Sequence, residues 1–202
     1  MKLTFEPNLD YQQDAIQSVV RLFDGQLLED SDYEYGLADG RLLDKVGCIG
    51  NRLVLSENQV LSNLQKVQEQ NNLTISEKLD GLNFSIEMET GTGKTYVYLR
   101  TIYELNKKYG FKKYVVVVPS VPIREGVLKN LQITHEHFQS IYDNIPIRFY
   151  VYDRNKISKI RGFADSDNIE VLVINIDSFA KDENVINKPN DKLSGQEPIK
   201  FI

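Results

Sequence analysis

Apolar residues at a spacing of about four predict a helix over residues 11–23. Asp10 is the expected N-cap of this helix, and Gly25 is the expected stop. The expected apolar stripe consists of Tyr11, Ala15, Val19, Val20 and Phe23. Further along, Ser56 and Gln59 have the spacing of a capping box and predict the start of a second helix.

From residue 82 onward the pattern alternates between strands and helices. An alternation of apolar and polar residues predicts a strand, and a period near four predicts a helix. The expected strands are 82–88, 114–118, 147–152 and 169–176, and the expected helices are 94–109 and 123–131. The β-branched run at 114–118 is typical of a parallel strand that is buried on both faces. Strands separated by helices predict an α/β fold with a mostly parallel sheet and helices on both of its faces.

Charge is distributed unevenly along the chain. Residues 1–80 carry 7 basic and 14 acidic side chains, whereas residues 100–161 carry 12 basic and 5 acidic ones. We therefore expect an N-terminal helix region over 1–25, an acidic insertion over 26–80 and an α/β domain over 81–202. The basic excess is consistent with a polyanionic partner such as DNA. A solvated charged surface explains it equally well.

The composition excludes several classes of protein. Hydrophobic residues make up 41% of the 202 residues, and the 12 Gly and 6 Pro are too few for a collagenous or low-complexity chain. No apolar run approaches the roughly 20 residues of a membrane helix, and acids stand near the N-terminus where a signal peptide has an apolar stretch. We expect a cytoplasmic protein with no membrane partner. The single cysteine, Cys48, excludes an intramolecular disulfide and is expected to be a buried, inert thiol.

The strongest chemical signal is the run Met-Glu-Thr-Gly-Thr-Gly-Lys-Thr that begins at Met88, between an expected strand and an expected helix. Gly91 and Gly93 allow successive main-chain N–H groups to converge on phosphate oxygens. Lys94 supplies a cation for the β- and γ-phosphates of a nucleotide, and Thr95 supplies a hydroxyl for Mg²⁺. The strict phosphate-loop pattern has a glycine where this chain has Met88. A glycine-rich helix start without a ligand is the alternative.

Several runs resemble superfamily-two motor proteins. The run Glu-Thr-Gly-Thr-Gly-Lys-Thr resembles motif I of superfamily-two helicases and translocases. The wider run Ile86–Arg100 resembles the motor part of the Res subunit of type III restriction enzymes. Val115–Gly126 resembles motif Ia of that family, and Val173–Phe179 resembles its motif Ib region. Gln12, at the start of the first helix, resembles the adenine-reading glutamine, with Gln13 as the alternative.

The resemblance implies a RecA-like P-loop domain that is incomplete at its C-terminus and carries an insertion between the first helix and motif I. It implies ATP and Mg²⁺ as ligands, double-stranded DNA as the track, and a methyltransferase (Mod) subunit as partner. In this family the whole protein is an ATP-dependent, site-specific endonuclease. The implied nucleotide-binding residues are Gln12, Thr90, Gly91, Thr92, Gly93, Lys94 and Thr95, with Lys94 and Thr95 catalytic and Thr95 holding the metal. The implied DNA-binding residues are Pro119, Ser120, Arg124, Asn175 and Ser178, although an ordinary turn accounts for the first three about as well.

The catalytic acid of such a motor is not evident. Asp177 follows an apolar strand, but a superfamily-two enzyme needs an Asp-Glu pair at that place. Asp182-Glu183 lies in a polar stretch, so Asp177 is interpreted as part of motif Ib. The resemblance places the Asp-Glu-Pro box beyond Ile202, so we expect these residues to bind nucleotide without hydrolysing it. The alternatives are another superfamily-two translocase, such as a type I restriction motor, and a self-contained P-loop kinase or nucleotide-binding module.

Overall fold

A computed structural model describes residues 5–28 and 50–202, which belong to two compact units. The first unit contains residues 5–28 and 52–110, and the second contains residues 50–51 and 111–202. Cys48 and much of the expected insertion, residues 29–49, lie outside the described residues.

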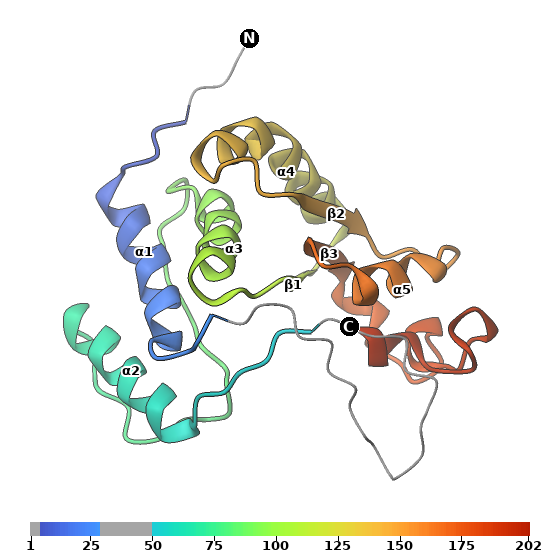
Figure 1. The fold of residues 1–202 in the computed structure, drawn as a ribbon, viewed down its shortest axis with the longest axis horizontal. Helices are drawn as coiled ribbons and strands as arrows, with labels where there is room; N and C mark the ends of the chain where they lie inside the picture. The colour runs from blue at the N-terminus through green and yellow to red at the C-terminus, as the bar shows by residue number, and fades with distance from the viewer. Residues whose placement is uncertain (1–4, 29–49) are drawn as a thin grey trace. The chain divides into compact units, whose positions relative to one another are not determined.

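The described part of the first unit is helical (Figure 1). Its elements are α1 (Asp10–Val20), the 3-10 turn η1 (Arg21–Phe23), α2 (Glu57–Gln70) and α3 (Lys94–Tyr109). Helix α1 packs along α3, and α2 packs against η1. The helices expected at 11–23, after Ser56 and at 94–109 are thus confirmed.

Helix α1 begins differently from the expectation. Its N-cap is Leu9, and Asp10 is the first helical residue. The carbonyl of Leu9 accepts hydrogen bonds from the main-chain N–H groups of Gln12 and Gln13, each at 3.0 Å. The Gln13 side chain also donates to the carbonyl of Pro7 at 2.7 Å, which fixes the turn of the chain into the helix. The assignment of Asp10 as N-cap was therefore wrong by one residue.

The buried face of α1 is also rotated from the expected stripe. Gln12, Ile16 and Val20 are buried at a spacing of four, whereas Tyr11 is 49% exposed. These three positions point in nearly the same direction from the helix axis, because four residues make slightly more than one turn. Gln12 can take a buried position because its amide nitrogen finds a main-chain oxygen, that of Thr92.

Helix α2 is fixed at its start and at its middle. Ser56 and Gln59 form the expected capping box, with reciprocal side-chain to main-chain hydrogen bonds. In the middle of the helix, the amide nitrogen of the buried Asn63 donates to the carbonyls of Leu22, at 3.1 Å, and Asp24, at 2.8 Å. Both carbonyls belong to the chain that leaves α1, so α2 packs in the same unit as α1 and α3.

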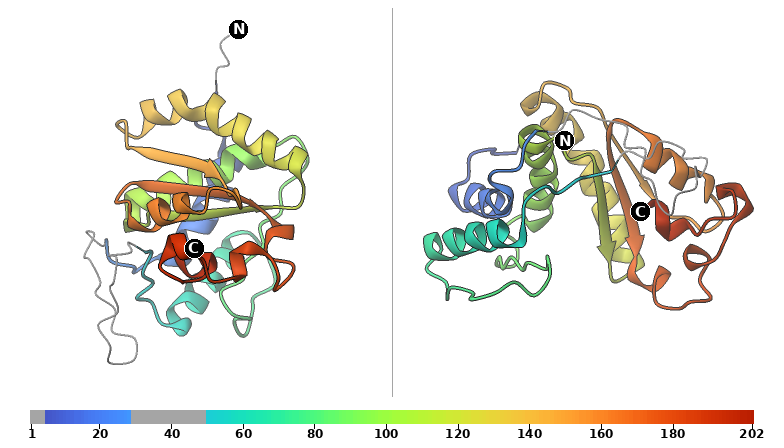
Figure 2. Two further views of the ribbon diagram at one scale, coloured as in Figure 1. Left: turned by 90° about the vertical axis from the view of Figure 1, so that its right-hand side faces the viewer. Right: turned by 60° about the horizontal axis from the view of Figure 1, so that its bottom comes forward.

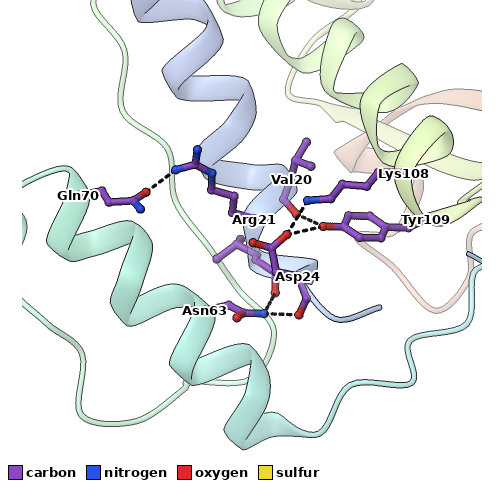
Figure 3. Close-up of polar contacts among 8 residues, drawn as sticks. Val20, Arg21, Asp24, Asn63, Gln70, Lys108 and Tyr109 are labelled. Atoms are coloured by element: carbon purple, nitrogen blue, oxygen red, sulfur yellow. Dashed lines mark hydrogen bonds and ion pairs between the residues drawn. The ribbon is translucent and has the colours of Figure 1, made fainter. Parts of the chain in front are cut away.

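The side chain of Asp24 joins this region to the end of α3 (Figure 3). Its carboxylate accepts from Lys108 Nζ at 2.6 Å and from the Tyr109 hydroxyl at 2.9 Å. Partial burial acts to raise the pKa of Asp24, but the hydrogen bonds from Lys108 and Tyr109, together with the positive charges of Lys108 and Arg21, outweigh it and hold the pKa below its usual value. The charged form of Asp24 is therefore the one that stabilises this unit.

The strand expected over 82–88 is not found. This segment pairs with no strand among the described residues, and Leu82 and Ile86 are about half exposed. A strand needs ladder hydrogen bonds to a neighbour as well as an alternating sequence. All the described strands belong to the second unit, whereas residues 82–88 belong to the first.

The second unit contains a parallel sheet (Figure 2). Its strands are β1 (Lys113–Val118), β2 (Ile147–Val151) and β3 (Ile169–Asn175), in the order β1-β3-β2. The connections are α4 (Val121–Ile141) and α5 (Ser158–Asp165). The expected α/β class with a parallel sheet is therefore confirmed, and the ends of these three strands lie within one residue of their predicted positions.

Helices cover both faces of this sheet. His135 of α4 lies against Phe149, with ring centroids 6.4 Å apart, and Phe163 of α5 lies against Tyr150, with centroids 6.2 Å apart. Phe149 and Tyr150 are successive residues of β2, and successive strand residues point to opposite faces. Helices α4 and α5 consequently pack on opposite faces, as right-handed crossovers require.

The strand buried on both faces is β3, not β1. Every β3 residue from Ile169 to Ile174 is at most 2% exposed. Strand β1 lies at an edge of the described sheet, and its Val117 is 49% exposed. The burial predicted for 114–118 was wrong because the order of strands, which decides which strand is central, is not written in a local sequence pattern.

The helices of the second unit are longer and more numerous than the sequence pattern predicted. Helix α4 is longer than the expected 123–131, and α5 was not predicted. The tail of the chain after β3 forms four short 3-10 turns, η2 (Ile176–Ser178), η3 (Val185–Asn187), η4 (Asp191–Leu193) and η5 (Pro198–Phe201). Leu193 of η4 packs with Ile157 and Ile160 in a buried cluster, so the tail is part of the folded unit. None of the described helices is long and apolar enough to cross a membrane.

Candidate nucleotide-binding site

The glycine-rich loop lies in the first unit and leads directly into α3. Gly93 is the N-cap of α3, with φ +86°, and Gly91 has φ +83°. Residues with a Cβ rarely adopt this left-handed region, so the loop conformation requires glycine at both positions. The Thr92 hydroxyl donates to the carbonyl of Glu89 at 2.7 Å, which closes the loop on itself.

The side chain of Lys94 folds back over this loop. Its Nζ donates to the carbonyls of Met88, at 2.5 Å, and Glu89, at 2.7 Å. Lys94 is exposed, although it stands at the first position of α3. Lys94 thus places a solvent-accessible cation over the loop, at the positive end of a 16-residue helix, and this arrangement favours a bound anion.

Gln12 reaches the loop from α1. Its Nε2 donates to the carbonyl of Thr92 at 2.9 Å, and a Cβ on Gly93 would lie only 2.7 Å from the same nitrogen. Gln13 instead uses its Nε2 on the carbonyl of Pro7. Of the two glutamines, Gln12 is the one that lies against the loop.

Two contacts that the sequence did not indicate fix the chain ahead of α1. The guanidinium of Arg100, which is buried on α3, donates to the carbonyl of Pro7. The ring of Phe5 stacks on Tyr96, with centroids 5.9 Å apart and an interplanar angle of 19°. The sequence feature that could have indicated the first of these contacts is Arg100, because a cation on an otherwise apolar helix face needs a partner.

Thr95 and Tyr98 stand one turn apart on α3. Burial raises the pKa of Tyr98 to about 12, and the neighbouring Thr95 hydroxyl offsets part of this rise. The hydroxyl oxygen of Tyr98 is fully buried, yet it makes no hydrogen bond of normal geometry to any described residue. Tyr98 therefore carries a buried polar group beside the expected metal-binding hydroxyl.

These residues fit a nucleotide with its magnesium ion. The cation of Lys94 and the main-chain N–H groups of the loop and first turn suit a phosphate chain, and the Thr95 hydroxyl is an oxygen ligand of the kind that Mg²⁺ prefers. Within residues 5–28 and 50–202, no cluster of three or more His, Cys, Asp and Glu side chains is arranged to hold a metal. A magnesium site of this kind relies on phosphate oxygens and water in addition to one protein hydroxyl.

The expected DNA-binding residues lie in the second unit, at one edge of its sheet. Pro119 and Ser120 follow the last residue of β1, whose register partner on β3 is Asn175. Ser178 ends the 3-10 turn that continues β3. The carboxyl ends of parallel strands meet at one edge, so these four residues lie at the same edge. Arg124 follows on the first turn of α4 and pairs with the adjacent Glu125 at 2.9 Å.

Asp177 lies in the same region with its side chain exposed. Its carbonyl and that of Ser178 accept hydrogen bonds from the side chain of Asn184, at 2.8 and 3.1 Å. Asp182 and Glu183 are also exposed and lie outside any strand. None of the described Asp-Glu pairs directly follows a strand.

Comparison with known proteins identifies similar sequences. The model of the protein family described as "Type III restriction enzyme, res subunit" matches residues 7–200. The Res subunit of the type III restriction-modification enzyme EcoPI, from Escherichia phage P1, is 32% identical over 192 residues, which cover 85% of this chain and 19% of that protein.

Two further relatives carry the same description. The Res subunit of EcoP15I, from Escherichia coli, is 30% identical over 233 residues, which cover 98% of this chain and 23% of that protein. The Res subunit of StyLTI, from Salmonella typhimurium, is 36% identical over 113 residues, which cover 48% of this chain and 11% of that protein. The chain therefore spans less than a quarter of the length of each of these relatives.

Proposed function

The chain belongs to the family of type III restriction enzyme Res subunits, and on this premise we propose that it is the ATP-binding part of a DNA-dependent ATPase and translocase. The whole protein would then be an ATP-dependent, site-specific endonuclease. Family membership favours this function over a type I restriction motor, and over a self-contained P-loop kinase or nucleotide-binding module.

The observation that carries the proposal is the position of the Lys94 ammonium group. It lies against the carbonyls of Met88 and Glu89, over a loop whose two glycines have positive φ. A triphosphate in the loop would exchange these two neutral acceptors for charged oxygens, and such charge-assisted hydrogen bonds are the stronger ones. Lys94 is therefore assigned to the β- and γ-phosphates of ATP.

The remaining nucleotide contacts follow from the same loop. Residues 90–95 present main-chain N–H groups at the start of α3, and the Thr95 hydroxyl is assigned to Mg²⁺. Magnesium, when bound with ATP, neutralises charge on the phosphates. Gln12 is assigned to the adenine, because its Oε1 can accept from the base while Nε2 holds the loop.

The DNA would lie along the edge of the second unit where β1 and β3 end. We assign a RecA-like topology to residues 81–202, because the parallel sheet of the second unit and the helices on its two faces follow that pattern. Ser120, Asn175 and Ser178 offer hydrogen-bond donors, and Arg124 offers a positive charge, for phosphates of double-stranded DNA. Pro119 shapes the turn that presents them. Recognition of a DNA sequence is assigned to a partner, a methyltransferase (Mod) subunit.

The chain's own residues account for binding and for part of catalysis. Hydrolysis of ATP also needs an acid that holds the metal and a second acid that positions water. Asp177 is exposed and is not followed by a glutamate, so we keep it in motif Ib.

Hydrolysis of ATP by the complete enzyme with its methyltransferase partner tests the proposal. Double-stranded DNA should raise the turnover of the wild-type enzyme several-fold, and Lys94→Ala should remove the stimulated turnover. A turnover that depends on Lys94 but does not respond to DNA would instead identify a nucleotide-dependent enzyme of another class.

A further inference from the structure

The hydroxyl group of Tyr98 is a buried polar group without a hydrogen-bond partner in the described part of the chain. More than nine in ten buried polar groups in proteins have a partner, and an exception calls for a physical explanation. Phenylalanine would fill the same space without the cost of burying a hydroxyl. A tyrosine at this position is therefore best explained by a partner that the hydroxyl meets in another state of the site.

The neighbour of this hydroxyl on α3 is Thr95. Residues three apart lie on one face of a helix, and long side chains lean toward the helix N-terminus. The ring of Tyr98 accordingly carries its hydroxyl back over the first turn, where Thr95 stands directly after Lys94.

The hydroxyl of Thr95 is not used as other helical threonines in this protein use theirs. Thr101, also on α3, donates to the carbonyl of Val97 at 2.8 Å, and Thr134 donates to the carbonyl of Asn130 at 2.8 Å. Among the described residues, no main-chain carbonyl accepts from the Thr95 hydroxyl. Its proton is therefore available to a side chain.

We propose that Tyr98 is a positioning residue for Thr95, whose hydroxyl proton it accepts when the Thr95 oxygen faces Mg²⁺. The proposal rests on the nucleotide-binding function proposed for the loop. A hydroxyl that gives a lone pair to a cation must direct its proton away from the cation, and a phenol oxygen has lone pairs that can accept that proton. Without this acceptor, the Thr95 side chain rotates more freely about χ1, and the rotamer that directs its oxygen toward the metal is less populated.

Binding of a non-hydrolysable ATP analogue, measured in Mg²⁺ and again in EDTA, tests this proposal on the full chain. Tyr98→Phe should weaken binding in Mg²⁺ about three- to tenfold, the worth of one hydrogen bond. It should leave binding in EDTA within about twofold of the wild type. Tyr103→Phe, which removes a phenol from a buried position of the same helix, is the matched control and should change neither value.

A double-mutant cycle with Thr95→Val separates positioning from packing. If Tyr98 acts through Thr95, adding Tyr98→Phe to Thr95→Val should produce no further loss in Mg²⁺. Equal losses in Mg²⁺ and in EDTA, or additive losses in the cycle, would overturn the proposal, and so would an unchanged affinity of Tyr98→Phe in Mg²⁺. The proposed nucleotide function itself would be overturned if the wild-type protein did not bind the analogue, or if the Lys94→Ala variant bound it as tightly as the wild type.

Discussion

The amide nitrogen of Gln12 lies 2.9 Å from the carbonyl oxygen of Thr92, which connects the start of α1 to the glycine-rich loop. The two residues are 80 positions apart in the sequence. The amide nitrogen of Gln12 thus supports the loop, and the proposed function assigns its amide oxygen to the base.

Replacement of Gln12 should affect both roles. Gln12→Ala should lower the affinity for ATP about tenfold and reduce the preference for ATP over GTP, since each lost hydrogen bond is worth roughly 1 kcal/mol. Competition of ATP and GTP against a fluorescent nucleotide measures both effects. Gln13→Ala is the matched control, because the Gln13 side chain is bonded to Pro7 instead. A larger loss in Gln13→Ala would reverse the assignment of the two glutamines.

The two glycines of the loop should differ in their tolerance of a side chain. Both have φ near +85°, so alanine costs each of them about 1–2 kcal/mol of backbone strain. A Cβ at Gly91 meets no atom within 4 Å, whereas a Cβ at Gly93 would lie 2.7 Å from Gln12 Nε2. Gly93→Ala should therefore destabilise the protein by about 1 kcal/mol more than Gly91→Ala. Urea unfolding of the two variants compares them, and equal values would contradict the close contact with Gln12.

The stability of the first unit should fall in acid because of Asp24. Burial acts to raise the pKa of Asp24, but the hydrogen bonds from Lys108 and Tyr109 and the positive charges of Lys108 and Arg21 together hold it below its usual value of 3.8 in the folded protein. The charged carboxylate of Asp24 thus stabilises the fold at pH values above 3.8, and this contribution is lost as the pH falls through the folded-state pKa of Asp24.

Urea unfolding at a series of pH values between 6 and 3 measures this effect. Asp24→Asn should lower the stability at pH 6 and flatten its decline toward pH 3. Asp80→Asn removes an exposed carboxylate of the same unit and is the control. A decline that is as steep in Asp24→Asn as in the wild type would assign the acid sensitivity to other groups.

The proposed contact of Arg124 with DNA should be visible in the salt dependence of binding. Arg124→Ala should weaken DNA binding by the complete enzyme and reduce the slope of log affinity against log salt by about one, as expected for one lost phosphate contact. Lys129→Ala changes an exposed cation further along the same helix and should leave the slope unchanged. Equal slopes for all three proteins would place the DNA elsewhere.

The parts that the sequence predicted well depend on residues close together in the chain. The approximate bounds predicted for α3 agree with the structure, where a glycine precedes Lys94, a glycine follows Tyr109 and an apolar period fills the interval. The capping box of α2 depends only on Ser56 and Gln59.

Three further failures concern relations across the chain. The alternation at 82–88 is typical of a strand, but pairing needs a neighbour that the described structure does not supply. Strand β1 has the sequence of a central strand, yet β3 takes that position. The buried face of α1 was misjudged at Gln12, because a glutamine becomes a buried residue only where a distant carbonyl accepts its hydrogen bond.

The most direct test of the account is the affinity of Lys94→Ala for a non-hydrolysable ATP analogue in Mg²⁺, measured by calorimetry. Lys94 provides the only side-chain cation assigned to the phosphates, and its loss should weaken binding about 100-fold, which corresponds to nearly 3 kcal/mol. Lys107→Ala, which removes an exposed cation from the last turn of the same helix, is the control and should bind within about twofold of the wild type. An affinity of Lys94→Ala equal to that of the wild type would contradict the assignment of residues 90–95 as a phosphate-binding loop.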